Sequence, residues 1–376
     1  MKRIQERFRW PGVFLLACAL LVTISGRVMA ERAITDMAGR VVTIPDEVTR
    51  VICSGAGCLR LLTYVQAHDR IVAVDSIEVR GSRIDARPYA IANPQFKTYP
   101  MFGEFRGHDN PELIVALEKR PQVIFKTFAD RGVDPDKLQE KTGIPVVVLD
   151  YGNLTWGREA LNRSIRLMGE VMGREARAED VVAALSGWIE DLDRRTKDIP
   201  EDHRPTCYIG GLGQSGPHGF QSTEPSFAPF TFTHARNIAA QAPGEKPLSH
   251  TNISKEKIIM EDPEFIFLDV STVRLGEEAS ALGQLERDPA YVALSAVRSA
   301  KVYFLLPYNS YNQNFESIIA NSYYVGKVLY PEHFEDVDPD KKADELSIFL
   351  NGGPSFKALK DQFDGLPFEK IDLRRN

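Results

Sequence analysis

The sequence predicts an α/β protein of two Rossmann-like lobes, each a mainly parallel sheet with flanking helices, joined by one long interdomain helix. Two observations predict this fold. Short β-branched runs alternate with amphipathic segments in both halves of the chain, and a long helical stretch without a Gly/Ser linker separates the halves. Strands that alternate with helices are typical of parallel β-α-β units. We therefore expect lobes at 31–155 and 201–376, an interdomain helix at 156–200, and a leader at 1–30.

The first lobe contains four apolar runs that are short enough to be strands and have the near-continuous apolar character of strands covered on both faces. These predicted strands are residues 50–55, 70–75, 122–127 and 145–150. The predicted helices between them are residues 57–67, 110–120 and 134–143. The second of these begins with Asn110, Pro111 and Glu112, a capping residue followed by a proline and an acid, which is typical of a helix N-terminus.

The middle of the chain, residues 156–200, has apolar residues at helical spacing over 161–172 and 181–192, and the predicted helix ends at Pro200. Gly169 and Gly173 are the interior positions at which such a helix would weaken or break. After it, predicted strands and helices alternate again. The strands are residues 206–211, 264–270 and 301–307, and the helices are residues 254–263, 284–294, 315–330 and 340–351.

The N-terminus has the pattern of a secretory signal peptide. Four basic residues precede an uncharged apolar run at 13–24, and small residues at 28–30 follow it. The run is short for a membrane span, which needs about 20 apolar residues. An uncleaved anchor is the alternative, and lipidation at Cys18 is disfavoured because the apolar run continues past it. Cleavage after Ala30 would remove five basic residues and one acid, a net +4, and change the net charge from −6 to −10. Such an acidic protein is not expected to bind nucleic acid.

Three cysteines remain beyond the leader: Cys53, Cys58 and Cys207. They are too few for a disulfide scaffold. Cys53 and Cys58 are close enough in sequence to form a disulfide in an oxidising compartment, and three buried thiols without a role are the alternative. Two cysteines without a neighbouring Cys/His pair do not form a zinc site.

Four features occur in a characteristic order. Residues 34–75 contain an Asp-x-x-Gly-Arg hairpin, an Ile-Pro, an Arg-Val strand, a helix and an Arg-Ile-Val strand, and the long helix lies near the middle. Two segments near 110 and 254 each contain a glutamate that opens a helix, a proline and an apolar strand. Together, after a signal peptide, these features resemble the helical-backbone class of ABC-importer binding proteins, which bind iron-siderophores, haem and cobalamin.

The resemblance implies a periplasmic, monomeric binding protein without enzymatic activity or a resident cofactor, which delivers its ligand to an ABC-importer permease. It also implies that Glu112 and Glu256 dock onto arginines of the permease. Two exposed carboxylates on two rigid lobes would fix the orientation of the contact. The alternative is that each glutamate only stabilises its own helix through the helix dipole.

We expect the ligand between the lobes, at the carboxyl ends of the parallel strands. The loops there are rich in Tyr, Asn, His and Arg, which suit an anionic metal chelate or a weakly shielded metal ion, although Asn, Gly and Ser also favour turns for backbone reasons. The predicted ligand-binding residues are Tyr308, Asn312, His218, Tyr311, Arg106, His108 and Gln214. The resemblance favours an iron-siderophore type of complex and leaves haem, cobalamin and other metal complexes open; the metal itself is unknown.

Two other patterns favour different functions weakly. Residues 211–216 spell Gly-x-Gly-x-x-Gly after a strand, but no helix is predicted to begin there, as a dinucleotide site requires. Ser215 near His218 is the only local suggestion of an exported α/β hydrolase, and no acid partner can be assigned. A ligand-free scaffold or sensor is a third hypothesis.

Overall fold

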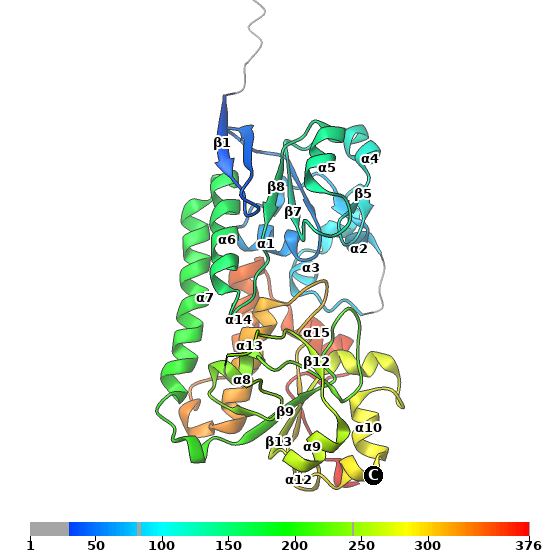
Figure 1. Cartoon of the computed structure of the whole chain (residues 1–376), viewed down its shortest axis with the longest axis vertical. Helices are drawn as coiled ribbons and strands as arrows, with labels where there is room; N and C mark the ends of the chain where they lie inside the picture. The colour runs from blue at the N-terminus through cyan, green and yellow to red at the C-terminus, as the bar shows by residue number, and fades with distance from the viewer. Residues whose placement is uncertain (1–29, 81–83, 243, 376) are drawn as a thin grey trace, which may run out of the picture.

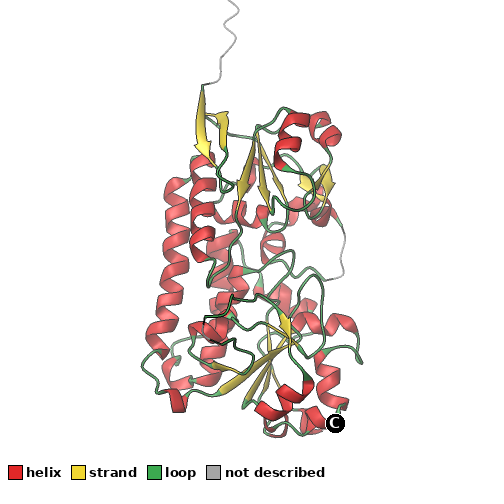
Figure 2. Ribbon diagram, viewed as in Figure 1, coloured by secondary structure: helices red, strands yellow, loops and turns green. Residues whose placement is uncertain are grey.

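The computed structural model describes residues 30–80, 84–242 and 244–375. The predicted leader, with Cys18, lies outside them except for Ala30. Figure 1 shows two lobes stacked along the long axis of the molecule, with a pair of helices along one side. In both lobes helices flank a central group of strands (Figure 2), so the predicted α/β class is confirmed. No helix in the described ranges is long and apolar enough to cross a membrane.

The N-terminal lobe is built on a parallel sheet of order β3-β7-β8 and a smaller sheet of order β4-β5-β6. The strands of these two sheets are β3 (Val51–Ser54), β4 (Val74–Asp75), β5 (Met101–Glu104), β6 (His108–Asp109), β7 (Val123–Thr127) and β8 (Val146–Leu149). The helices are α1 (Cys58–Tyr64), α2 (Ser76–Val79), α3 (Pro88–Ala92), α4 (Pro111–Ala116) and α5 (Pro135–Thr142). All three helices predicted in this lobe are present, as α1, α4 and α5.

An antiparallel hairpin of β1 (Glu31–Thr35) and β2 (Val41–Pro45) begins the described chain. Its turn is held by Asp36, whose Oδ1 accepts hydrogen bonds from the backbone N–H of Ala38 and of Arg40, both at 3.0 Å. The Arg40 guanidinium donates to Asp36 Oδ2 at 2.9 Å and to the carbonyl of Val146 at 2.5 Å. The Asp-x-x-Gly-Arg motif therefore closes the hairpin and attaches it to β8.

The C-terminal lobe contains a sheet of order β11-β9-β13-β14-β15, parallel except for β15, and a small antiparallel pair, β10-β12. The strands are β9 (Thr206–Gly210), β10 (Ser222–Thr223), β11 (Arg236–Asn237), β12 (Thr251–Asn252), β13 (Phe265–Asp269), β14 (Val302–Leu305) and β15 (Lys370–Ile371). The helices are α8 (Ala228–Phe232), α9 (Lys255–Glu261), α10 (Ala281–Arg287), α11 (Pro289–Val292), α12 (Ser295–Arg298), α13 (Phe315–Leu329), α14 (Pro339–Asn351) and α15 (Phe356–Gln362). Short 3-10 helices in the two lobes are η1 (His68–Arg70), η2 (Pro94–Thr98), η3 (Glu201–His203), η4 (Val270–Leu275), η5 (Pro331–His333) and η6 (Leu373–Arg375).

The prediction of one helix over 284–294 is wrong. The chain leaves the helical conformation at Asp288, which is extended and caps α11 through a hydrogen bond from the Ala290 N–H. Pro289 causes the break, because proline disfavours a helical conformation in the residue before it.

The prediction of one long interdomain helix over 156–200 is also wrong. The segment forms two helices, α6 (Arg158–Met172) and α7 (Glu175–Thr196), which pack side by side (Figure 1). The break is at Gly173, whose φ of 60° is left-handed and caps α6. Only α7 runs along both lobes, so a helical hairpin, rather than a single rod, joins them.

The C-terminal helices α14 and α15 also connect the lobes, because they pack on α1 and α3 of the N-terminal lobe. The Asn93 amide donates to the carbonyl of Asn351 at 3.0 Å. From α7, the Arg177 Nε donates to the carbonyl of Tyr64 at 2.9 Å, and its guanidinium lies over the Phe349 ring at 4.2 Å. The lobes therefore share a buried interface, in addition to the helical hairpin.

A buried ion pair fixes one of the loops between the lobes. The fully buried Lys126, on β7, donates to the carboxylate of the buried Asp109 at 2.6 Å and to the carbonyl of Gly107 at 3.2 Å. It also donates to the Ser54 hydroxyl at 3.1 Å. Because all three bonds converge on one ammonium group, Lys126 holds the loop between β5 and β6 against the parallel sheet.

Replacing Asp109 with alanine should lower the free energy of unfolding by about 3–5 kcal/mol, because it leaves the Lys126 ammonium buried without a counterion. Urea unfolding of the mature protein would measure the loss. Asp130→Ala, at an exposed position on a nearby turn, is the matched control and should change stability by less than about 0.5 kcal/mol. Equal stabilities of the two variants would contradict the structural role of the pair.

Candidate ligand-binding cleft

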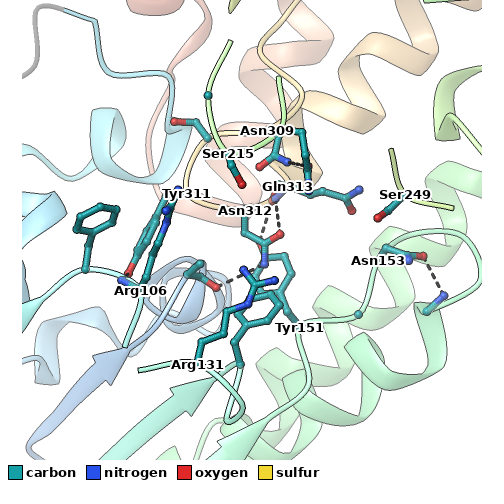
Figure 3. Close-up of a pocket in the computed structure, with 18 of the residues that line it drawn as sticks. Arg106, Arg131, Tyr151, Asn153, Ser215, Ser249, Asn309, Tyr311, Asn312 and Gln313 are labelled. Carbon is teal, nitrogen blue, oxygen red and sulfur yellow. Dashed lines mark hydrogen bonds between the residues drawn. The ribbon is translucent and has the colours of Figure 1, made fainter. Parts of the chain in front are cut away.

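A cavity of about 510 Å³ lies between the lobes and is lined by residues of both (Figure 3). The N-terminal lobe contributes aromatic and basic side chains: Phe105, Arg106, Phe128, Arg131, Tyr151 and Trp156. The C-terminal lobe contributes hydroxyls, amides and a further arginine: Gln214, Ser215, Ser249, Ser271, Arg274, Asn309, Ser310, Tyr311, Asn312 and Gln313. Most of these residues follow the carboxyl ends of parallel strands, where a ligand site was expected.

The loop at 309–313 follows β14 and forms one wall of the cavity. Tyr311 and Asn312 have φ values of 50° and 83°, a left-handed conformation that is uncommon for residues other than glycine. Arg60 of α1 donates to the carbonyl of Gln313 at 2.8 Å and to that of Ser310 at 3.0 Å. A side chain of the N-terminal lobe therefore fixes both ends of this C-terminal-lobe loop.

Arg60 is fully buried, and it also donates to the Tyr151 hydroxyl and to the Asn314 side-chain oxygen, each at 2.5 Å. Burial by itself lowers the pKa of Arg60, but Tyr151 and the buried Glu316 carboxylate raise the pKa by more. The guanidinium therefore stays charged. Glu316 in turn accepts hydrogen bonds from Tyr64 and, at 3.2 Å, from the amide of Asn351.

Tyr311 makes a second connection across the cleft. Its hydroxyl donates to the Asp75 carboxylate at 2.5 Å and accepts a hydrogen bond from the backbone N–H of Arg106 at 2.9 Å. Burial, followed by the charge of nearby Glu78, raises the pKa of Asp75 to about 7. Tyr311 therefore ties the C-terminal-lobe loop to the loop of the N-terminal lobe that carries Arg106.

The cavity has an excess of positive charge. Arg106, Arg131 and Arg274 line it, and none of the three makes an ion pair with a described residue. The guanidinium of Arg106 lies over the Phe105 ring at 5.1 Å, and that of Arg131 lies over the Phe128 ring at 5.3 Å. Against these three cations the described lining has one acid, Asp150. Guanidinium groups without counterions favour a ligand with negative charge.

The structure brings four of the seven predicted ligand-binding residues to the cavity. They are Asn312, Tyr311, Arg106 and Gln214. Figure 3 shows Arg131 directed towards Asn312 and Tyr151.

The other three predicted residues lie elsewhere. Tyr308 is 2% exposed and lies in the core of the C-terminal lobe. His218 is half-buried: its Nε2 lies 2.7 Å from the carbonyl oxygen of Gln214, and its ring contacts that of His250 at 5.4 Å. His108 lines a separate surface groove beside Glu112 rather than the cavity.

Sequence reasoning missed Arg131, Trp156 and Arg274. Arg131 follows β7 and Arg274 follows β13, so both lie past the carboxyl end of a strand that the sequence predicts. Loops at the carboxyl ends of predicted parallel strands are expected to line the site, and this expectation applies to both arginines. Trp156 also follows a predicted strand, since it lies in the segment between β8 and α6, but the sequence predicted it as the first residue of the interdomain helix rather than as part of that loop.

The alternative functions have little support from the geometry. No helix begins at Gly216, since the glycine-rich segment leads into β10, so a phosphate would find no helix N-terminus there. Ser215 is exposed, and no hydrogen bond joins it to His218 in the described structure. Cys53, Cys58 and Cys207 are buried and free. The described residues contain no group of three or more His, Cys, Asp or Glu that could hold a metal ion.

Comparison with known proteins identifies the family. The family model described as periplasmic binding protein matches residues 51–308. The chain belongs to the periplasmic binding protein family. Its members bind solutes rather than catalyse reactions.

Several relatives extend this result. The molybdate-binding protein MolA of Haemophilus influenzae is 25% identical over 356 residues, 88% of this chain and 93% of that protein. The solved structure of MolA bound to molybdate has a TM-score of 0.64 at 22% identity, covering 86% of this chain and 98% of that one. A TroA-like periplasmic binding protein, FepB, of Veillonella parvula has a TM-score of 0.57 at 23% identity, covering 90% and 98%. The periplasmic haem-binding protein HutB of Vibrio cholerae has a TM-score of 0.53 at 18% identity, covering 75% and 99%.

Tyr308 has a structural partner beneath the cavity. Its hydroxyl donates to Oε1 of Glu224 at 3.2 Å, and Oε2 of Glu224 is buried without a hydrogen-bond partner. Burial raises the pKa of Glu224 to about 8, and the hydrogen bond from Tyr308 opposes this only in part. Glu224 therefore retains its proton to a higher pH than an exposed glutamate does.

Glu224→Gln should gain stability relative to the wild type as the pH rises from about 4.5 to about 8. Over this range the unfolded chain loses the glutamate proton, whereas the folded chain must retain it or bury a charge, so the wild type becomes less stable. Urea unfolding at pH 5 and pH 8 would measure the difference. Glu118→Gln, at an exposed position, should give no such trend, and parallel pH dependence of the wild type and Glu224→Gln would refute the assignment.

Proposed function

We propose that this periplasmic binding protein captures an anionic metal complex between its lobes and delivers it to the permease of an ABC importer. The observation that carries the proposal is the set of three arginines, Arg106, Arg131 and Arg274, which face the cavity from both lobes without counterions among the described residues. An anion bound between them would contact both lobes at once. Each bidentate guanidinium contact would supply both affinity and orientation.

The metal would enter with its own ligands. The described cavity lining offers hydroxyls, amides, guanidinium groups and the single carboxylate of Asp150, but no histidine, cysteine or glutamate. These groups are suited to hydrogen bonds with the outer oxygens of a complex rather than to direct coordination of a transition metal. Two classes of ligand meet this requirement: an organic metal chelate and a metal oxyanion.

A chelate of the iron-siderophore type is the first candidate. The cavity volume of about 510 Å³ is typical of sites for drug-sized molecules. Aromatic faces of Phe105, Phe128 and Trp156 would contact the organic part, while the arginines contact its charge. Haem fits the same description, whereas a bare metal ion does not.

A tetrahedral oxyanion such as molybdate is the second candidate, and a specific observation favours it. The relative MolA is 25% identical over most of this chain and is named as a molybdate-binding protein. Serine hydroxyls and side-chain amides, such as those of Ser215, Ser249 and Asn309, are suitable donors to such an oxyanion.

The proposed contact with the permease uses Glu112 and Glu256. Each is an exposed residue in the first turn of a short helix, α4 and α9, one on each lobe. Neither makes an ion pair with a described residue, so both are available to cations of a partner. The helix dipole at each N-terminus stabilises the same carboxylates, and this effect is compatible with docking.

Thermal unfolding of residues 31–376 with a panel of ligands would test the proposal. The panel contains molybdate, tungstate, sulfate, ferric citrate, a ferric catecholate, haem and cobalamin. A ligand present at 100 times its dissociation constant adds about 2.7 kcal/mol to the free energy of unfolding, which raises the unfolding temperature by a few degrees. Stabilisation by a ferric chelate supports the first candidate, and stabilisation by molybdate but not sulfate supports the second. Stabilisation only by neutral cobalamin would contradict an anion site.

Alanine at Arg106, Arg131 or Arg274 should weaken binding of the ligand that the panel identifies by roughly ten- to a hundred-fold. Loss of one charged hydrogen bond costs about 1.5–3 kcal/mol. Isothermal titration calorimetry would measure the change. Arg298→Ala, on an exposed position of α12, is the matched control and should bind normally. Unchanged affinity in all three cavity variants would refute the charge-based proposal.

Ligand binding should change the fluorescence of Trp156, which lines the cavity and is 57% exposed. After removal of the leader, Trp188 is the only other tryptophan, and it packs edge-on against Phe349 at 5.5 Å, away from the cavity lining. Trp188→Phe should keep the ligand-dependent signal and Trp156→Phe should lose it. The opposite result would place the ligand outside this cavity.

A further inference from the structure

We infer that each docking glutamate is paired with exposed apolar side chains on the same helix face, so that the partner contacts Val115 beside Glu112, and Ile259 and Met260 beside Glu256. The inference rests on the proposed permease contact and adds a second, apolar component to it. The resulting surface on each lobe, termed here a docking face, joins a carboxylate without an ion pair to exposed hydrocarbon.

The two helices match at the capping residue, the glutamate and the buried isoleucine. The side chain of Asn110 caps α4 by accepting from the Leu113 N–H at 3.0 Å, and Ser254 caps α9 by accepting from the Lys257 N–H at 3.2 Å. The glutamate follows two residues after each cap. Ile114 and Ile258, two residues further on, are both fully buried. Since each isoleucine anchors its helix to its own lobe, the opposite faces are directed outward.

The spacing places apolar side chains beside the glutamates. Residues three and four apart lie on the same face of a helix. Val115 is three residues from Glu112, Ile259 is three residues from Glu256, and Met260 is four. The exposed fractions are 42% for Val115, 38% for Ile259 and 77% for Met260. The same pairing of an acid and an apolar group therefore occurs at equivalent positions on both lobes.

Exposed large apolar side chains are concentrated at these two helices. Of those in the described structure, Met101, Leu113 and Val115 lie on or next to α4, and Ile259 and Met260 lie on α9. Met101 and Leu113 also line the groove beside Glu112. The remaining ones are distributed over five other segments: Val41, Trp156, Leu248, Val292 and Ile348. Clustered exposed apolar groups indicate an interaction site, whereas isolated ones are common.

The charged residues around the docking faces indicate which kind of partner binds there. Near Glu256 on α9, Lys255 donates to Asp288 at 2.5 Å and so already has a carboxylate partner. A partner that presents a basic side chain bordered by apolar groups complements each docking face. α4 and α9 lie at opposite ends of the molecule, on the side away from α7 (Figure 1). A single partner that contacts both must present two such sites, as a permease with two related halves would.

The apolar groups would supply affinity while the carboxylates set orientation. Burial of apolar area is the main favourable contribution to most protein association, and complementary charges mainly affect encounter rate and specificity. The ligand cavity shares no residue with either docking face, so substitutions there should leave ligand binding unchanged.

Photo-crosslinking in cells of the organism that encodes the chain would test the inference. Benzoylphenylalanine is placed in the full-length chain at 115, 259 or 260. Positions 112 and 256 test the glutamate contact itself, and 41 and 348, which carry exposed apolar residues on β2 and α14, are the controls. We expect adducts with one and the same integral membrane protein from 115, 259 and 260, and no such adduct from the controls. Val115→Ala with Ile259→Ala should reduce adducts from 112 at least five-fold, whereas Val41→Ala should not reduce them. Neither change should alter ligand affinity.

The outcomes separate the apolar component from docking as such. Adducts from 112 and 256 but none from 115, 259 and 260 would overturn the inference and leave the proposed permease contact in place. Adducts with a second copy of this chain, or with different proteins from the two lobes, would overturn it as well. Absence of membrane-protein adducts at every position would remove the docking proposal together with the inference, while the ligand panel would still test capture.

Discussion

The arrangement of the cleft depends on the buried guanidinium of Arg60. This residue belongs to the first helix of the N-terminal lobe, yet its acceptors include two backbone carbonyls of the loop at 309–313 in the C-terminal lobe. A buried charge is tolerated only where hydrogen bonds and a counterion replace water. Arg60 meets this condition only when the lobes are together, because Glu316 and Asn314 also come from the C-terminal lobe. Separating the lobes would expose this charge to water or leave it buried without hydrogen-bond partners. The relative orientation of the lobes is therefore restrained.

Two buried cations support the two sides of the cavity in a similar way. Arg60 holds the loop with Tyr311 and Asn312, and Lys126 holds the loop that follows Arg106 through the carbonyl of Gly107. Both cations are compensated by buried acids. The arginines that face the cavity lack such compensation among the described residues. The molecule thus separates charges that maintain its shape from charges that are available to a ligand.

Much of the fold could be predicted because short segments of the sequence determine their own secondary structure. Apolar runs bounded by turn residues predicted the strands, and capping residues such as Asn110 and Ser254 mark helices that are present. The errors are at Gly173 and Pro289, where one residue changes the backbone direction. Apolar residues recur at helical spacing on both sides of each position, so pattern alone did not separate one helix from two. The site was predicted less completely, since Tyr308 and His218 belong to segments that reach the cavity but do not line it themselves.

The sequence by itself determined the α/β class, the two lobes and the two equivalent glutamate helices, because these follow from periodicity and capping within short segments. Tertiary structure decided which loop residues face the ligand and which are core. It joined Arg60 to a loop some 250 residues away and left Arg106, Arg131 and Arg274 without counterions among the described residues. It also decided which apolar residues of α4 and α9 remain exposed. The physical reason is that burial and charge pairing arise between segments distant in sequence, and no local pattern specifies them.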